Sequence, residues 1–142
     1  MTAKRWIKLS IFLAIVGISA LLIFHALYAV MNLSFATSAT INWYGIEEVL
    51  TDEETETLKE ALSGVWKKEQ PSKCGYDASF WIRFSNGRKE VFCFPGTDDC
   101  GIVAMNSVTE GPFYGASNET RDYIRALIKK YELREKWEET RQ

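Results

Sequence analysis

ASFWIRFSNGRKEVFCF, residues 78–94, is the stretch that decides the fold. Apolar and polar residues alternate over Ala78–Phe84 and again over Lys89–Phe94, which is typical of two half-buried strands. Asn86-Gly87 lies between them, and this dipeptide favours a two-residue type I′ turn. The sequence therefore predicts a β-hairpin. The two-residue turn gives three predicted cross-strand pairs: Arg83 with Glu90, Ile82 with Val91, and Phe80 with Cys93.

The two faces of this hairpin have different compositions, and the face with Ile82 and Val91 is the predicted core side. Aromatic residues mark the opposite face, and Phe113-Tyr114 adds two more in a loop flanked by glycines. Aromatic side chains in such settings can anchor a protein partner. The alternative is that the third strand or a helix covers them. The predicted partner surface consists of Trp81, Phe92, Phe94, Phe113 and Tyr114.

Two helices and further strands are predicted around the hairpin. Thr51 and Glu54 form a capping box that opens a helix, and Gly64 is a plausible end. A second helix begins near Asn118, and its apolar stripe runs to Tyr131. Gly101–Met105 is a predicted third strand. The apolar face of the first helix is predicted from Leu58, Ala61, Leu62 and Val65, and the segment Ala39–Tyr44 is either a short strand or a membrane-proximal brace.

The N-terminal segment Leu9–Val30 contains no Asp, Glu, Lys or Arg. Its 22 residues would form a helix about 33 Å long, which is enough for a hydrocarbon core of about 30 Å. Basic residues precede it at Lys4, Arg5 and Lys8, and none follows until Lys59. The positive-inside rule therefore predicts a cytoplasmic N-terminus and an extracytoplasmic domain.

A cleaved signal peptide is the alternative interpretation of this segment. Small residues at Ser34–Ala36 and Thr37–Ala39 have the spacing of a cleavage site. The apolar core is longer than the usual 7–15 residues or so of a signal peptide, which favours an anchor. The predicted organisation is a cytoplasmic tail (1–8), a transmembrane helix in contact with the lipid bilayer (9–31), a linker (32–40), an extracytoplasmic domain (41–132) and a charged C-terminal tail (133–142).

Taken together, these elements predict an α+β chain. An N-terminal transmembrane helix precedes a small antiparallel sheet, made of the hairpin plus a third strand and flanked by two helices. The 14 basic and 19 acidic residues from Glu47 onward give this region a net charge of −5. Nucleic-acid binding requires a cationic surface, so nucleic acid is excluded as an expected partner.

Cys74, Cys93 and Cys100 all follow the apolar segment, so an oxidising compartment favours a disulfide among them. Cys93 is predicted beside Phe80, and the strand between Phe80 and Cys74 would span about 20 Å, too far for a bridge. Cys74–Cys100 is therefore the predicted disulfide, with Cys93 as a buried thiol. Cys93–Cys100 is the competing pair.

Catalytic and metal-binding patterns are weak in this sequence. The single His, His25, lies in the apolar segment, so Ser-His, Cys-His and His-metal mechanisms are not expected in the domain. Asp98-Asp99 can hold a cation or act as an acid–base pair, but adjacent acids in a turn are more often turn formers. Asn118-Glu119-Thr120 matches a glycosylation acceptor, although capping by Asn118 or Ser117 is favoured.

The function expected from the sequence is that of a membrane-anchored, non-enzymatic protein-interaction domain with no cofactor and no metal. Its partner would be another membrane or extracytoplasmic protein. The alternatives are a small-ligand or cation-sensing domain that uses the Asp98-Asp99 loop, a secreted form released by signal-peptide cleavage, and a carboxylate-dependent hydrolase.

Overall fold

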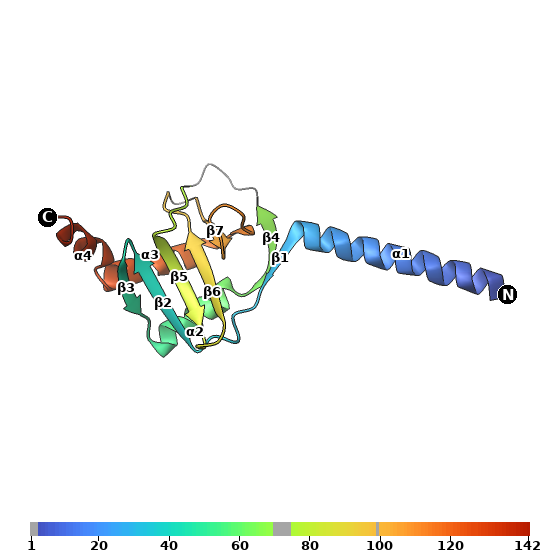
Figure 1. Ribbon diagram of the computed structural model, residues 1–142, viewed down its shortest axis with the longest axis horizontal. Coiled ribbons are helices and arrows are strands. Elements are labelled where there is room, and N and C mark those ends of the chain that lie inside the picture. Colours follow the sequence, from blue (N-terminus) through green and yellow to red (C-terminus); the bar gives the residue numbers. More distant parts are fainter. Residues whose placement is uncertain (1–2, 70–74, 99) are drawn as a thin grey trace.

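A long apolar helix and a folded domain make up this protein, whose computed structural model describes residues 3–69, 75–98 and 100–142. The helix, α1 (Ala3–Leu27), extends away from the domain (Figure 1). Trp6–Leu27 is 22 residues long and apolar enough to cross a membrane, and none of its most apolar window is buried. Membrane anchors and signal sequences both contain an apolar helix of this kind.

The described part of the domain is α+β and contains an eight-stranded antiparallel sheet with the strand order β1-β4-β8-β7-β6-β5-β2-β3 (Figure 1). This sheet is larger than the predicted hairpin plus third strand. The strands are β1 (Tyr28–Met31), β2 (Ser38–Trp43), β3 (Ile46–Val49), β4 (Gly64–Glu69), β5 (Phe80–Ser85), β6 (Glu90–Pro95), β7 (Ile102–Met105) and β8 (Phe113–Gly115). The helices that follow α1 are α2 (Asp52–Leu62), α3 (Asn118–Lys130) and α4 (Leu133–Glu139).

The hairpin β5–β6 forms as predicted, but its register differs by two residues. Its loop has four residues, Asn86–Lys89, instead of two. The Asn86 side-chain oxygen accepts the backbone N–H groups of Arg88 and Lys89, at 3.0 and 2.9 Å, and this stabilises the wider loop. The observed pairs are Ser85 with Glu90, Phe84 with Val91, Arg83 with Phe92, and Ile82 with Cys93.

A register shift of two residues leaves every side chain on its predicted face, because side chains alternate with a period of two. The inner face carries Ile82, Phe84 and Cys93, all fully buried. The predicted charge pair also survives, since Arg83 and Glu90 lie diagonally across the strands with a nitrogen–oxygen distance of 3.7 Å.

The helices α2 and α3 cover the inner face of the sheet and complete the core (Figure 1). Leu58 and Leu62 of α2 are fully buried, as the predicted apolar face of this helix requires. Val65, which was predicted on the same face, instead belongs to β4 and is exposed. Of the elements described, no helix covers the outer face of the sheet. The α3 residues of the core are Ile124, Leu127 and Ile128.

Local capping chemistry sets the first residue of each of these helices. The Thr51 hydroxyl accepts the Glu54 N–H, and the Glu54 carboxylate accepts the Thr51 N–H, so the predicted capping box is present. Ser117 caps α3 by accepting the Thr120 N–H at 3.1 Å. Asn118 is the first residue of α3.

The folded domain includes two segments that were predicted to lie outside it: the end of the transmembrane helix and the linker. The helix ends at Leu27, and β1 follows without an intervening residue and pairs with β4. Leu33 and Ala36, within the predicted linker 32–40, are buried in the core. Pairing with β4 gives the β1 backbone hydrogen-bonding partners within the domain. The burial of Leu33 and Ala36 then holds the following segment against the core.

The predicted charged tail, 133–142, contains a short helix that packs on the domain. Leu133 at the start of α4 is fully buried. The Trp137 ring lies 5.0 Å from the ring of Tyr44, and Lys136 forms an ion pair with Glu48 of β3. The predicted polar character therefore describes only the solvent side of α4.

Candidate functional site

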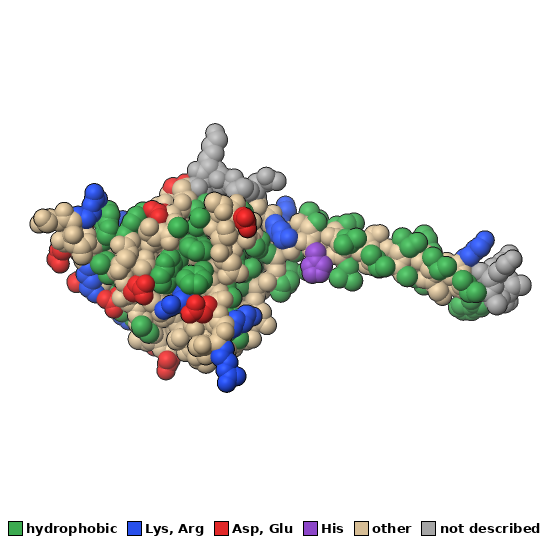
Figure 2. Space-filling model, viewed as in Figure 1, with side chains coloured by type: hydrophobic (Ala, Val, Ile, Leu, Met, Phe, Trp, Pro, Cys, Tyr) green, Lys and Arg blue, Asp and Glu red, His purple; other side chains and the backbone are tan. Residues whose placement is uncertain are grey.

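An aromatic cluster lies on the outer face of the sheet. Trp81 of β5 and Phe92 and Phe94 of β6 are all half-buried there. The rings of Trp81 and Phe92 meet edge-to-face with their centres 5.4 Å apart, and the rings of Phe92 and Phe94 are stacked at 6.2 Å. Figure 2 shows hydrophobic side chains gathered over β5 and β6, with charged side chains around them. These three residues are therefore placed together, as the sequence predicts.

Arg83 adds a cation to this cluster. Its guanidinium carbon lies 5.6 Å from the centre of the Trp81 ring, within the range of a cation–π contact. The same side chain approaches Glu90, so it is held over the outer face. We refer to Trp81, Arg83, Phe92 and Phe94 as the aromatic face.

Phe113 and Tyr114 do not belong to the exposed part of this surface, contrary to the prediction. Both lie in β8, so their side chains point to opposite faces of the sheet. Phe113 points outward but is only 5% exposed, and the Tyr76 ring lies 5.2 Å from it. Tyr114 points into the core, where its hydroxyl lies 3.4 Å from the Met31 sulfur. Both were predicted in a loop because β8 is only three residues long, too short to show a strand alternation in the sequence.

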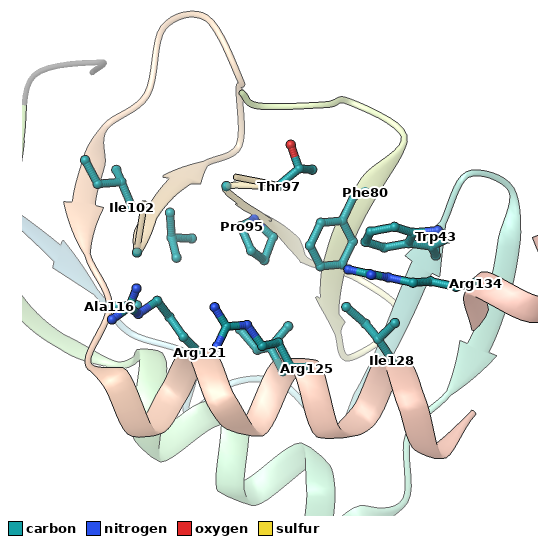
Figure 3. A pocket seen from close by; sticks show the side chains of 14 residues that line it. Trp43, Phe80, Pro95, Thr97, Ile102, Ala116, Arg121, Arg125, Ile128 and Arg134 are labelled. Carbon is teal, nitrogen blue, oxygen red and sulfur yellow. The ribbon is translucent and has the colours of Figure 1, made fainter. Parts of the chain in front are cut away.

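A hollow lies on the other side of the sheet, between α3 and the ends of β5, β6 and β7 (Figure 3). Its cavity volume is about 50 Å³, and it opens to solvent. Its apolar lining includes Trp43, Phe80 and Ile128. Three arginines complete the lining: Arg121, Arg125 and Arg134. We refer to this hollow as the arginine pocket.

The arginines of this pocket are held by neighbouring side chains. Arg125 forms an ion pair with Asp122, one turn earlier in α3, at 2.9 Å. The Arg134 guanidinium carbon lies 4.9 Å from the centre of the Trp43 ring, and Figure 3 shows Arg134 beside Trp43 and Phe80. Arg121 hydrogen-bonds to the Asn118 side chain. The pocket therefore combines an apolar floor with cationic walls.

The sequence contained part of the signal for this pocket. Arg121 and Arg125 are four residues apart, a spacing that places two side chains on the same side of a helix. Arg134 lies on a different helix, and only the packing of α4 against β2 and β3 brings it to the pocket. Sequence patterns gave no means of predicting that packing.

Cys93 and Tyr114 form a buried polar contact in the core. Cys93 is a free cysteine and is fully buried, and burial raises the pKa of its thiol to about 12. Burial also raises the pKa of Tyr114. The Cys93 sulfur lies 4.0 Å from the Met31 sulfur. A protonated thiol in this setting packs as a small apolar side chain.

The predicted Cys74–Cys100 disulfide involves a residue outside the described ranges, because Cys74 is not described. The bridge therefore stays a prediction. Asp99 also lies outside the described residues, whereas Asp98 is described as a loop acceptor. Its carboxylate accepts the Gly75 N–H at 3.0 Å and the Cys100 N–H at 3.4 Å. In the described ranges, no group of three His, Cys, Asp or Glu side chains is arranged to hold a metal ion.

Comparison with known proteins adds no functional assignment to this geometry. No protein-family model, curated protein or solved structure shows a significant match to the chain. The aromatic face and the arginine pocket are therefore interpreted from their own chemistry.

Proposed function

We propose that this chain is a membrane-anchored, non-enzymatic protein-interaction domain. In this proposal α1 spans the bilayer with its N-terminus in the cytoplasm, and the α+β domain is extracytoplasmic. Support for the anchor comes from the 22-residue apolar span and from the three basic residues that precede its core. The partner is another protein in the same membrane or at its extracytoplasmic surface.

The uncovered aromatic face is the observation that carries this proposal. Trp and Arg are enriched among the residues that dominate binding energy at protein interfaces. Here Trp81 and Arg83 are adjacent on the outer face, and the aromatic stack of Phe92 and Phe94 continues the apolar surface. We infer a partner surface that presents apolar side chains to the rings and an acidic group to Arg83.

Tethering to a bilayer favours a partner in the same membrane. A domain joined directly to its anchor meets membrane-bound partners at a high effective concentration, so a modest interface suffices for stable association. In the described residues, β1 follows α1 without a linker, which confines the domain to the vicinity of the membrane.

In situ photocrosslinking tests the aromatic face as the contact. A photoreactive phenylalanine analogue replaces Phe92 in the full-length protein, and crosslinked products are collected from the native membrane. We expect a discrete adduct with another protein. Adding Trp81→Ala should reduce its yield by about tenfold or more, since losing a hot-spot residue costs about 2 kcal/mol or more.

Glu60 provides the matched control for this experiment. It is exposed on α2, the helix that covers the opposite face of the sheet from the aromatic face. The same analogue at Glu60 should not give this adduct, and Glu60→Ala should leave the yield from position 92 unchanged. An equal adduct yield in the Trp81→Ala and parent proteins, at equal protein abundance, would contradict the proposal.

The arginine pocket supports small-ligand binding as a second candidate function. The Arg134 guanidinium in its wall favours an anion rather than the cation considered for the Asp98-Asp99 loop. We propose a carboxylate carried on a short apolar stem, with the stem against Phe80 and Ile128 and the carboxylate near Arg134 (Figure 3). Pockets for small molecules typically combine such an apolar lining with a few polar groups.

Titration with hexanoate, followed by NMR of the detergent-solubilised full-length protein, tests this second function. Hexanol retains the stem without the charge, and acetate retains the charge with little stem. We expect saturable shifts of pocket resonances with hexanoate alone. Arg134→Gln should weaken this binding about tenfold, whereas Arg88→Gln in the hairpin loop should leave it unchanged. Equal responses to all three compounds would exclude a built site.

A further inference from the structure

A group of exposed apolar side chains lies where the domain meets α1. Tyr28 and Val30 of β1 are 38% and 56% exposed, and Val65 of β4 is 57% exposed. Val30 and Val65 are direct cross-strand partners, so their side chains lie side by side on the outer face. We refer to β1 and β4 together as the collar. In Figure 1 the collar is the part of the sheet nearest α1.

Two lysines lie beside these apolar residues. Lys67 is the cross-strand partner of Tyr28 and is exposed. Lys68 is also exposed, and its ammonium donates to the His25 carbonyl oxygen in the last turn of α1 at 2.6 Å. This bond satisfies a carbonyl at the helix end and ties β4 to α1. The collar therefore carries cations at the level where the apolar helix ends.

The length of the apolar helix defines where this level falls in a bilayer. The 22 residues of Trp6–Leu27 span about 33 Å, slightly more than the hydrocarbon thickness of about 30 Å. Leu27 then lies at the edge of the hydrocarbon, and Tyr28, which stacks on Phe24 with ring centres 5.1 Å apart, lies among the headgroups. Tyrosine is enriched at this depth because its ring is apolar and its hydroxyl is polar.

We propose that the collar lies on the lipid headgroup region of the outer leaflet. Tyr28, Val30 and Val65 contact the interface between headgroups and hydrocarbon, and Lys67, on the same face, meets lipid phosphates. Lys68 holds β4 to the end of α1 through the His25 carbonyl. This inference rests on the membrane anchor of the proposed function. It adds that the domain has a fixed orientation on the bilayer, because the strand paired to β4 continues directly from the helix.

Spin labels at single introduced cysteines test this inference in the full-length protein. The protein is reconstituted in vesicles of phosphatidylcholine and phosphatidylglycerol and labelled with a maleimide nitroxide at Val30→Cys or Val65→Cys. Collision with oxygen, which concentrates in lipid, is compared with collision with a water-soluble nickel complex. Incorporation of label into the parent protein gives the background, and the native thiol Cys93 is fully buried.

Two further labelled positions make the outcomes distinguishable. Leu21→Cys lies in α1 and reports on the anchor, while Val49→Cys lies at the far edge of the sheet, on β3. We expect the ratio of oxygen to nickel collisions at positions 30 and 65 to exceed that at position 49 several-fold. The ratio at position 21 should be higher still.

The inference about the collar is overturned if positions 30 and 65 match position 49 while position 21 is in lipid. It is also overturned if positions 30 and 65 are shielded from both reagents, because that result indicates a protein contact. Water accessibility at position 21 would instead refute the anchor itself, and with it the proposed function.

Discussion

At the residue scale, Glu54 joins two helices through one buried carboxylate. It accepts hydrogen bonds from the Lys130 ammonium at 2.7 Å and the Tyr131 hydroxyl at 2.6 Å, in addition to its capping bond with Thr51. Burial raises the pKa of Glu54, but these hydrogen bonds outweigh burial and lower it to about 2. The same hydrogen bond from Tyr131 raises the pKa of that phenol.

Replacing Glu54 with Gln should lower the free energy of unfolding by about 1–3 kcal/mol, because the buried hydrogen bonds lose their charge. The loss should also depend on pH. The native pKa lies below the ordinary value of 4.5, so the stabilisation is complete above pH 4.5 and disappears as the pH falls towards 2. Thermal unfolding of the full-length parent and variant proteins across this range measures the effect.

The exposed neighbour Glu53 gives the matched control for this prediction. Glu53→Gln removes one negative charge from the same turn of the helix, as Glu54→Gln does. In the described contacts, however, Glu53 touches neither Lys130 nor Tyr131. Its effect should stay within about 0.5 kcal/mol. A stability difference between Glu54→Gln and the parent that is the same at pH 7 and pH 3 would show that the carboxylate is not stabilised in its charged form.

At the element scale, Asn106 ends β7 and fastens it to β6. Its backbone has a positive φ of 60°, its N–H donates to the Phe92 carbonyl at 2.8 Å, and its side-chain oxygen accepts the Phe92 N–H at 3.1 Å. Phe92 belongs to the aromatic face, so this junction helps hold a proposed contact residue in position. Asparagine tolerates a left-handed conformation better than most residues.

Three substitutions at Asn106 should separate its backbone role from its side-chain role. Asn106→Asp keeps the acceptor and should cost least. Asn106→Gly keeps the left-handed conformation but loses the acceptor, and should cost about 1 kcal/mol. Asn106→Ala loses both and should cost about 2 kcal/mol. Urea unfolding of the detergent-solubilised protein gives this order, and equal losses for Gly and Ala would contradict the backbone role.

At the scale of the whole molecule, the proposed anchor and the distribution of charge determine the topology. The basic residues Lys4, Arg5 and Lys8 precede the apolar core, while the region from Glu47 onward is acidic. The three cations therefore favour retention of the N-terminus in the cytoplasm. In this proposal the polar domain is the part that is translocated to the extracytoplasmic side.

A reporter that requires an oxidising compartment, fused after Gln142, should be active in this topology. Replacing Lys4, Arg5 and Lys8 with Glu should reduce the active fraction several-fold, whereas replacing Arg134, Lys136 and Arg141 should not, because those cations are far from the apolar segment. Intact mass separates the anchored form, which retains residue 1, from a cleaved secreted form. A cytosolic reporter in the parent protein would refute the proposed topology.

Local sequence patterns determined the elements whose signals are complete within a few residues. The alternation around Asn86-Gly87 predicted β5 and β6, the Thr51–Glu54 capping box predicted α2, and the uninterrupted apolar stretch predicted α1. Both faces of the hairpin were also correct, which placed Trp81, Phe92 and Phe94 together. Each of these signals depends on neighbouring residues alone, so the sequence was sufficient for them.

Only the tertiary structure decided the short strands β1, β4 and β8, and with them the position of Tyr114 in the core. A strand of three to six residues has too few alternations to specify its faces, and its backbone hydrogen bonds depend on a partner distant in the chain. The same reason applies to the arginine pocket and to Lys130 and Tyr131 at Glu54. Sequence determined which local elements form, and packing determined which side chains meet.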